Sequence, residues 1–161
     1  MIFVCVGSRN YQFDRLLKKM DELVAAGRLP DEVFAQIGQS NYEPENYKYE
    51  RYVDTERFHK LQHEASVIIS HGGTGALISA LKMGKQLVAV PRLKKYGEHI
   101  DDHQLQVCEA MEEEGYLRCA RDMDELEEKI ILAFKEPIQK KYARPSRIVE
   151  TIEEYIEANR K

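Results

Sequence analysis

The sequence predicts an α/β fold: a doubly wound, mostly parallel, Rossmann-like sheet of six strands. Runs at 2–6, 66–70 and 86–90 are almost continuously apolar and are bounded by Gly, Pro or His. This is typical of parallel strands that helices cover on both faces. Amphipathic segments separate the runs, and strands that alternate with helices favour a parallel sheet. Because 161 residues match one ordinary domain, we expect a single domain over residues 1–161.

Six strands and six helices are expected along the chain. The strands are predicted at 2–6, 32–37, 47–53, 66–70, 86–90 and 117–119. Apolar residues at intervals of three or four predict helices that include 13–23, 55–61, 77–81, 105–111, 123–134 and 148–156. Asp122 and Glu125 resemble a capping box at the fifth helix. The last helix, over 145–159, is expected to pack on the domain or to face a partner.

The composition is that of a soluble globular chain and excludes several classes of function. A net charge of −4 argues against a general nucleic-acid binder, which usually has a basic excess. Cys5, Cys108 and Cys119 form no CxxC pair, so neither a zinc knuckle nor a disulfide framework is indicated, and a cytoplasmic setting is expected. The first apolar run is not typical of a signal peptide, and no run approaches the roughly 20 apolar residues of a membrane span. Any membrane contact is expected to be peripheral and through a partner.

The strongest local signal is the glycine-rich segment after the fourth predicted strand, His71-Gly72-Gly73-Thr74-Gly75. Glycines let the backbone approach a ligand closely. The helix that follows offers free N–H groups and the positive end of its dipole, which suit a diphosphate. His71 and Thr74 can add side-chain hydrogen bonds. The spacing matches neither G-x-G-x-x-G nor a Walker loop, and a tight turn without a ligand is the alternative.

A second polar segment, 91–104, follows the predicted strand at 86–90. Arg92 is predicted to contact phosphate oxygens bidentately. Side chains that suit sugar hydroxyls, which need both donors and acceptors, are Glu98, Asp102, His103 and Gln104. Two alternatives stay open for the segment: a metal site that uses His99 and His103, and a solvated charged loop.

Shorter segments after the other predicted strands carry weaker signals. The candidates for binding phosphate, sugar or base are Gly7, Ser8 and Arg9 after the first strand, Gln36 and Gly38 after the second, and Val53 at the end of the third. A Gly-Ser turn can place backbone and hydroxyl donors near a phosphate or sugar. Each of these segments fits a plain turn or a helix start equally well.

With these residues assembled, the chain resembles the C-terminal domain of family-28-type glycosyltransferases. The resemblance runs nearly end to end and includes FVCVGS, EVFAQIGQSNYEP and ASVIISHGGTGALISALKMGKQLVAVPR. It extends to small stand-alone versions of the domain, such as the UDP-binding subunit of the eukaryotic enzyme that adds the second GlcNAc to dolichol diphosphate. The run from Gly97 to Gln104 is most specific to bacterial PssE-type subunits of exopolysaccharide or capsule synthesis. The implied fold is the C-terminal half of a GT-B enzyme.

The resemblance implies a site for a UDP-sugar. Segment 72–75 would hold the diphosphate, the segment near Val53 would face uracil, and His103 with Gln104 would approach the donor sugar. The helix after the glycines would approach the ribose. Full-length relatives have an acidic residue on that helix where this chain has Ser79, whose hydroxyl binds ribose less strongly than a carboxylate. Arg9 also departs from the family's usual opening and is expected to tune the choice of donor.

A reaction is hypothesised from these residues, and the resemblance implies a partner. We expect an inverting, metal-independent hexosyl transfer to a polyprenyl-diphosphate-linked acceptor, without a cofactor. Helix-end N–H groups and Arg92 would stabilise the leaving UDP. A membrane-anchored partner subunit would supply the acceptor half and the main base, and Glu98 and His99 are the local acid–base candidates. The alternative is a non-catalytic subunit that stabilises such a partner.

Overall fold

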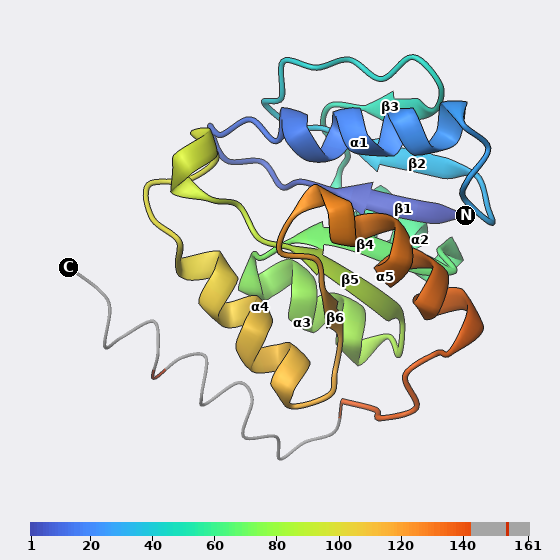
Figure 1. Cartoon of the computed structure of the whole chain (residues 1–161), viewed down its shortest axis with the longest axis vertical. Helices are drawn as coiled ribbons and strands as arrows, with labels where there is room; N and C mark the ends of the chain where they lie inside the picture. The colour runs from blue at the N-terminus through green and yellow to red at the C-terminus, as the bar shows by residue number, and fades with distance from the viewer. Residues whose placement is uncertain (143–153, 155–161) are drawn as a thin grey trace.

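The computed structural model describes residues 1–142 and Glu154, so the predicted helix at 145–159 lies outside the described residues except for Glu154. The described part contains one six-stranded sheet with the strand order β3-β2-β1-β4-β5-β6 (Figure 1). Every neighbouring pair of strands is parallel. The predicted doubly wound α/β fold is therefore confirmed, and the sheet is wholly rather than mostly parallel.

Strands and helices alternate in nearly the order that the sequence predicts. The strands are β1 (Ile2–Cys5), β2 (Val33–Gln36), β3 (Lys48–Glu50), β4 (Val67–His71), β5 (Gln86–Val90) and β6 (Arg118–Cys119). The helices are α1 (Asp14–Ala25), α2 (Thr55–Glu64), α3 (Thr74–Lys82), α4 (His103–Glu113) and α5 (Met123–Lys135), and a short 3₁₀ helix, η1 (Lys94–Tyr96), was not predicted. β3 and β6 are shorter than predicted because each lies at an edge and pairs with one neighbour over a few residues.

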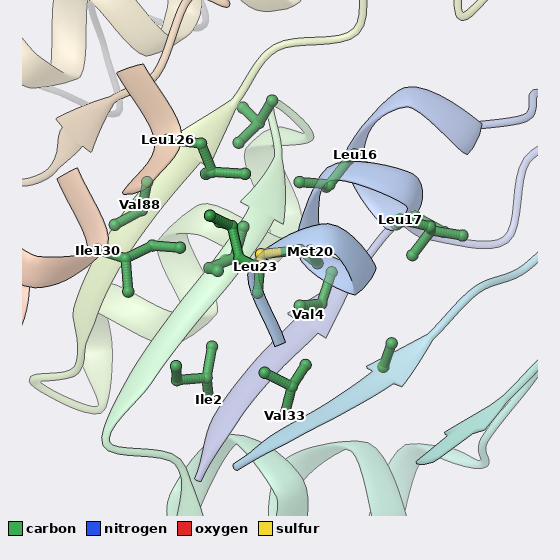
Figure 2. Packing of buried hydrophobic residues seen from close by; sticks show 14 of the residues in the cluster. Ile2, Val4, Leu16, Leu17, Met20, Leu23, Val33, Val88, Leu126 and Ile130 are labelled. Atoms are coloured by element: carbon green, nitrogen blue, oxygen red, sulfur yellow. The ribbon is translucent and has the colours of Figure 1, made fainter. Parts of the chain in front are cut away.

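Successive residues of the central strands point to opposite faces of the sheet, which produces two cores. Ile2, Val4 and Val6 pack beneath α1 and α5, where Met20 and Ile130 are fully buried (Figure 2). Phe3 and Cys5 belong to the other core, beneath α2, α3 and α4. This two-sided burial explains why the strand sequences are continuously apolar.

The strand order reverses direction between β1 and β4. From β1 the chain continues to β2 and β3 on one side, and β4 begins the half that runs to β5 and β6 on the other side (Figure 1). The loops that follow β1 and β4 therefore diverge and leave a crevice outside the carboxyl ends of the strands. This edge is where the predicted site residues are concentrated.

Candidate functional site

A cleft of about 680 Å³ opens at the carboxyl ends of β1, β4 and β5. It combines residues from four segments of the chain: the loop after β1, the β4–α3 junction, the loop after β5 and the first turn of α4. The lining residues are Val6, Gly7, Ser8, Arg9, Tyr11, His71, Gly72, Gly73, Thr74, Gly75, Ala76, Arg92, His99, His103 and Gln104. The glycine-rich segment, the Gly-Ser turn and part of the 91–104 segment are thus brought together as one site.

The N-terminus of α3 faces this cleft. Gly73 is the N-cap, and because it has no side chain it makes no capping hydrogen bond. The first backbone bond of the helix runs from the Leu77 N–H to the Gly73 carbonyl, so the N–H groups of the first turn have no partner within the helix. Thr74, Gly75 and Ala76, which carry these groups, all line the cleft. The arrangement provides the unpaired donors and positive dipole end that bind anions.

The imidazole of His71 is wedged between two glycines. A Cβ on Gly7 would lie 2.8 Å from its Nε2, and a Cβ on Gly73 would lie 2.9 Å from its Nδ1. Glycine is required at both positions because any side chain would collide with the ring. Burial, followed by the charges of Arg92 and Arg9, lowers the pKa of His71 to about 3. His71 is therefore uncharged at neutral pH and contributes a hydrogen-bonding group without a positive charge.

Gly72 allows α4 to approach the glycine-rich segment. A Cβ at this position would lie 2.6 Å from the Cβ of Gln104 and 3.0 Å from the Sγ of Cys108. The Gly72 N–H donates to Oε1 of Gln104 at 3.1 Å. Close contact between the two segments therefore depends on the absence of a side chain at residue 72.

Arg92 reaches the cleft, but its guanidinium is turned into the protein. Its Nη1 donates to the carbonyls of Tyr11 (3.2 Å), Gln12 (2.9 Å) and Glu98 (3.4 Å), and its Nη2 donates to the carbonyl of Val6. Burial lowers the pKa of Arg92 to about 10, against the opposing influence of Glu98, so the side chain stays charged at neutral pH. Arg92 ties the loop after β1 to the loop after β5 and places a positive charge behind the cleft.

Glu98 is fully buried and lies outside the cleft lining. Its carboxylate forms a bidentate pair with Arg15, with both N–O distances at 3.0 Å, and Oε1 also accepts from the Leu93 N–H at 3.0 Å. A carboxylate in this position holds the β5–α4 loop against the start of α1. Glu98, a predicted acid–base candidate, is thus part of an internal ion pair.

His99 and His103 line the cleft together with Arg9 and Tyr11. The ring of His99 packs against Tyr11 at a centroid distance of 5.2 Å, and its Nδ1 is 3.1 Å from Oδ1 of Asp101. The same carboxylate oxygen accepts from the backbone N–H of His103 at 3.0 Å. Among the described residues, no group of three or more His, Cys, Asp or Glu side chains is placed to hold a metal ion.

A family model, the glycosyltransferase family 28 C-terminal domain, matches residues 1–158. The chain belongs to this family. A curated relative in Homo sapiens, UDP-N-acetylglucosamine transferase subunit ALG13, is 28% identical over 132 residues, which cover 72% of this chain and 10% of the relative. The chain thus spans about a tenth of the length of that relative.

Solved structures share the fold of this family 28 domain at low sequence identity. An NMR solution structure of ALG13 matches with a TM-score of 0.54 and 16% identity, covering 94% of this chain and 92% of that one. The glycosyltransferase SnogD from Streptomyces nogalater matches with a TM-score of 0.61 and 16% identity, and the match covers 97% of this chain and 39% of the SnogD chain. MurG of Acinetobacter baumannii matches with a TM-score of 0.57 and 16% identity, and the match covers 96% of this chain and 49% of the MurG chain. The sheet is thus one part of a GT-B glycosyltransferase architecture.

Several predicted binding residues of this family 28 domain lie away from the cleft lining. They are Gln36, Gly38, Val53, Ser79 and Asp102 in addition to Glu98. Ser79 donates its hydroxyl hydrogen to Oε1 of Gln62 at 3.1 Å, and Asp102 accepts from the Lys94 N–H at 2.8 Å. Val53 packs against the core beneath α2 and α3. Their predicted contacts with uracil, ribose and sugar stay predictions.

Gln36 and Gly38 build the wall behind the Gly-Ser turn. Oε1 of Gln36 accepts from the N–H groups of Val6 (3.3 Å) and Gly7 (3.1 Å). Its Nε2 donates to the carbonyls of Gly7 (3.0 Å) and Arg51 (2.8 Å). A side chain on Gly38 would collide with the Gly7 carbonyl. Both residues shape the turn that carries Ser8 and Arg9, which do line the cleft.

Sequence reasoning missed Val6, Tyr11 and Ala76 as lining residues and Arg15 as the partner of Glu98. Ala76 follows the glycine-rich segment directly, so its place in the first turn of α3 was available from the sequence. Tyr11 and Arg15 carried no comparable signal. Their roles depend on the loop after β5, which is about 80 residues away in the chain.

The sequence contains one D-x-D triplet, Asp122-Met123-Asp124. Asp122 is the N-cap of α5 and completes the predicted capping box with Glu125. The triplet therefore begins a helix and does not line the cleft. No helix in the described part of the chain combines the length and apolar character that a membrane span requires.

Proposed function

We propose that this chain is the donor-binding and catalytic subunit of a split, UDP-sugar-dependent glycosyltransferase. It transfers a hexose, with inversion, to a polyprenyl-diphosphate-linked sugar in exopolysaccharide or capsule synthesis. The observation that carries the proposal is the uncapped N-terminus of α3, which opens into the cleft beside His71. Family membership supports the class of reaction, and the resemblance to the small bacterial subunits supports the acceptor.

The cleft suits a nucleoside diphosphate in size and charge. Its volume of about 680 Å³ falls within the roughly 300–1,000 Å³ of small-molecule sites. Arg9 is exposed at its mouth and the charge of Arg92 lies behind it. Together with the unpaired N–H groups of Thr74 to Ala76, these charges stabilise a diphosphate as a bound group and as a leaving group.

The main catalytic base comes from a partner subunit. None of the described residues that line the cleft is Asp or Glu, and a His71 with a pKa of about 3 is too weak a base to activate a hydroxyl at neutral pH. His99 and His103 are the local acid–base groups that remain. The curated relative is itself named a transferase subunit. The chain accordingly acts at the inner face of the membrane through a membrane-anchored partner, and it turns over weakly or not at all alone.

The transfer proceeds without a metal ion, because fixed N–H donors and arginine charges take the place of a divalent cation at the leaving group. The reconstituted pair is expected to keep its rate in EDTA. Loss of the rate in EDTA and its recovery with Mg²⁺ would contradict this part of the proposal. The measurement is initial-rate turnover with a radiolabelled UDP-sugar and lipid acceptor.

Donor binding is tested with matched substitutions at two helix N-termini. Thr74→Glu places a carboxylate on the first residue of α3, in the cleft, and Thr55→Glu places one on the first residue of α2, outside the cleft. Both positions favour a negative charge for helix stability, so both variants should fold. UDP affinity, measured by calorimetry, is expected to fall at least about 10-fold in Thr74→Glu, or about 1.4 kcal/mol, and to be unchanged in Thr55→Glu.

The same calorimetry separates the alternative function, a non-catalytic subunit that stabilises its partner. The absence of carboxylates from the described cleft lining favours this alternative, because such a subunit needs no base. It predicts no heat on addition of UDP to the wild-type chain and equal turnover of the reconstituted pair with Thr74→Glu and Thr55→Glu. Saturable UDP binding that Thr74→Glu removes would exclude it.

A further inference from the structure

Gln104, in the first turn of α4, is 8% exposed and is held by both sides of the cleft floor. Its Oε1 accepts from two backbone N–H groups, those of Gly72 and Arg92, each at 3.1 Å. An amide nitrogen cannot accept a hydrogen bond, so these two donors fix the orientation of the amide. The Nε2 of Gln104 must then be the atom that faces Nδ1 of His71, at 3.5 Å.

The orientation of this amide selects one form of the His71 ring. Nε2 of an amide only donates, so Nδ1 of His71 has to accept, and the ring hydrogen of the neutral imidazole is then on Nε2. Glycines 7 and 73 enclose the ring on two sides, because a Cβ at either position would lie within 3 Å of it. Its Nε2 edge lies at Gly7, a residue of the cleft lining.

We propose that Gln104 is a positioning residue that holds His71 as the Nε2–H tautomer, so that the cleft presents an uncharged hydrogen-bond donor to the departing diphosphate. The tautomer follows from the contacts of this chain alone, and the identity of the ligand rests on the proposed function. In the transfer, the bond between sugar C1 and the phosphate oxygen breaks and its electron pair stays on the phosphate. The acceptor oxygen bonds to C1 and its proton passes to a base, while His71 keeps its own proton.

The groups around His71 are consistent with a neutral ring. Arg92 from the loop after β5, Arg9 from the loop after β1, and His99 all act against protonation, in addition to burial. His103, at the start of α4, and Tyr11, in the loop after β1, are the other titratable side chains among the described residues that line the cleft. A ring that stays neutral retains the same N–H donor at neutral pH.

The test uses Gln104→Glu, which keeps an oxygen for the Gly72 and Arg92 N–H groups and places a second oxygen opposite Nδ1 of His71. In ¹⁵N-histidine NMR, wild-type His71 is expected to show the Nε2–H tautomer and no titration between pH 5 and 8. In Gln104→Glu the hydrogen is expected to move to Nδ1 and the pKa of His71 to rise. Gln106→Glu, which adds the same charge at an exposed position of α4, should leave the tautomer unchanged, and His71→Gln assigns the signal.

Calorimetry with UDP then measures what the tautomer contributes to binding. Because a new carboxylate weakens binding by its charge alone, Gln104→Glu is also made in the His71→Gln background, and the double-mutant cycle isolates the positioning effect. The loss of affinity is expected to be about 10-fold larger with His71 present. A wild-type Nδ1–H tautomer, an unchanged tautomer in Gln104→Glu, or equal losses in both backgrounds would overturn the proposal. If the tautomer switches but no variant binds UDP, the positioning role stands and the proposed function falls.

Discussion

The β4–α3 junction and the β5–α4 loop border the same cleft but contribute to it in opposite ways. The junction presents backbone: Thr74, Gly75 and Ala76 expose N–H groups at the start of a helix. The β5–α4 loop is richer in charge, yet it turns Arg92 and Glu98 into the protein, where they bind carbonyls and Arg15. The junction provides the backbone donors, and the β5–α4 loop lines the cleft with Arg92 and His99 while its buried charges support the fold.

A ligand site is therefore easier to predict from backbone geometry than from charged side chains. A glycine-rich strand-to-helix junction has one local outcome, because the free N–H groups belong to the helix itself. A charged side chain in a loop has two outcomes, a ligand or a partner elsewhere in the fold. For Glu98 the partner is 83 residues away, and no local pattern indicates it.

Among the substitutions that compare the two segments, Glu98→Ala is expected to have the largest effect on stability. Removing one member of a buried ion pair leaves the Leu93 N–H without its acceptor and Arg15 with only the Pro91 carbonyl, and such a loss typically costs about 3–5 kcal/mol. We expect a loss of this size in the free energy of unfolding, measured by urea denaturation. The exposed Asp102→Ala in the same loop should cost far less. A Glu98→Ala variant of nearly wild-type stability that has lost turnover would instead make Glu98 a catalytic residue.

The next largest effect is expected from Gly72→Ala. The added methyl would lie 2.6 Å from the Cβ of Gln104 and would push α4 from the junction, at a cost of about 1–3 kcal/mol for overpacking. The same methyl would disturb the Gly72 N–H bond to Gln104, so UDP affinity should fall as well. Thermal and urea unfolding together with UDP calorimetry check both expectations. Wild-type stability would show that the close packing of α4 is dispensable.

A pH effect of smaller size is expected from His71. Its pKa of about 3 lies below the usual value near 6.5, so between these values the unfolded chain binds more protons and stability falls as the pH falls. The slope approaches about 1.4 kcal/mol per pH unit. His71→Gln should have a flatter stability profile between pH 6.5 and 5, and the exposed His59→Gln should keep the wild-type profile. Parallel profiles for all three proteins would contradict the lowered pKa.

The smallest effect is expected from Gly75→Ala, the counterpart of Gly72→Ala within the same junction. No atom lies within 4 Å of the position that a Cβ would take, and alanine is favoured over glycine in a helix by up to about 1 kcal/mol. The melting temperature should rise slightly. Since the new methyl leaves the backbone N–H groups free, donor binding should persist, as UDP calorimetry can check. A fall in stability would indicate a contact at Gly75 that the cleft geometry does not show.

Much of the fold was predictable because its signals are local. The apolar runs that became β1, β4 and β5 are buried on both faces, and the Asp122 capping box formed where the spacing indicated it. The lengths of β3 and β6 were not predictable, since pairing at a sheet edge depends on the neighbouring strand. In the candidate site, the glycine-rich segment and Arg9 line the cleft, and their binding of a ligand stays a prediction. Gln36 does not line the cleft, because its amide is consumed by backbone groups that only the folded chain brings together.

The four hydrogen bonds of Gln36 have a consequence for the kinetics of binding. They join the ends of β1 and β3 through one side chain of β2, and Arg92 and the Arg15–Glu98 pair brace the opposite wall. Because hydrogen bonds and an ion pair hold both sides of the pocket, binding of the proposed nucleotide is expected to cost little conformational entropy. Association should then follow a single exponential whose rate rises linearly with nucleotide concentration, without the plateau that a slow closing step would impose.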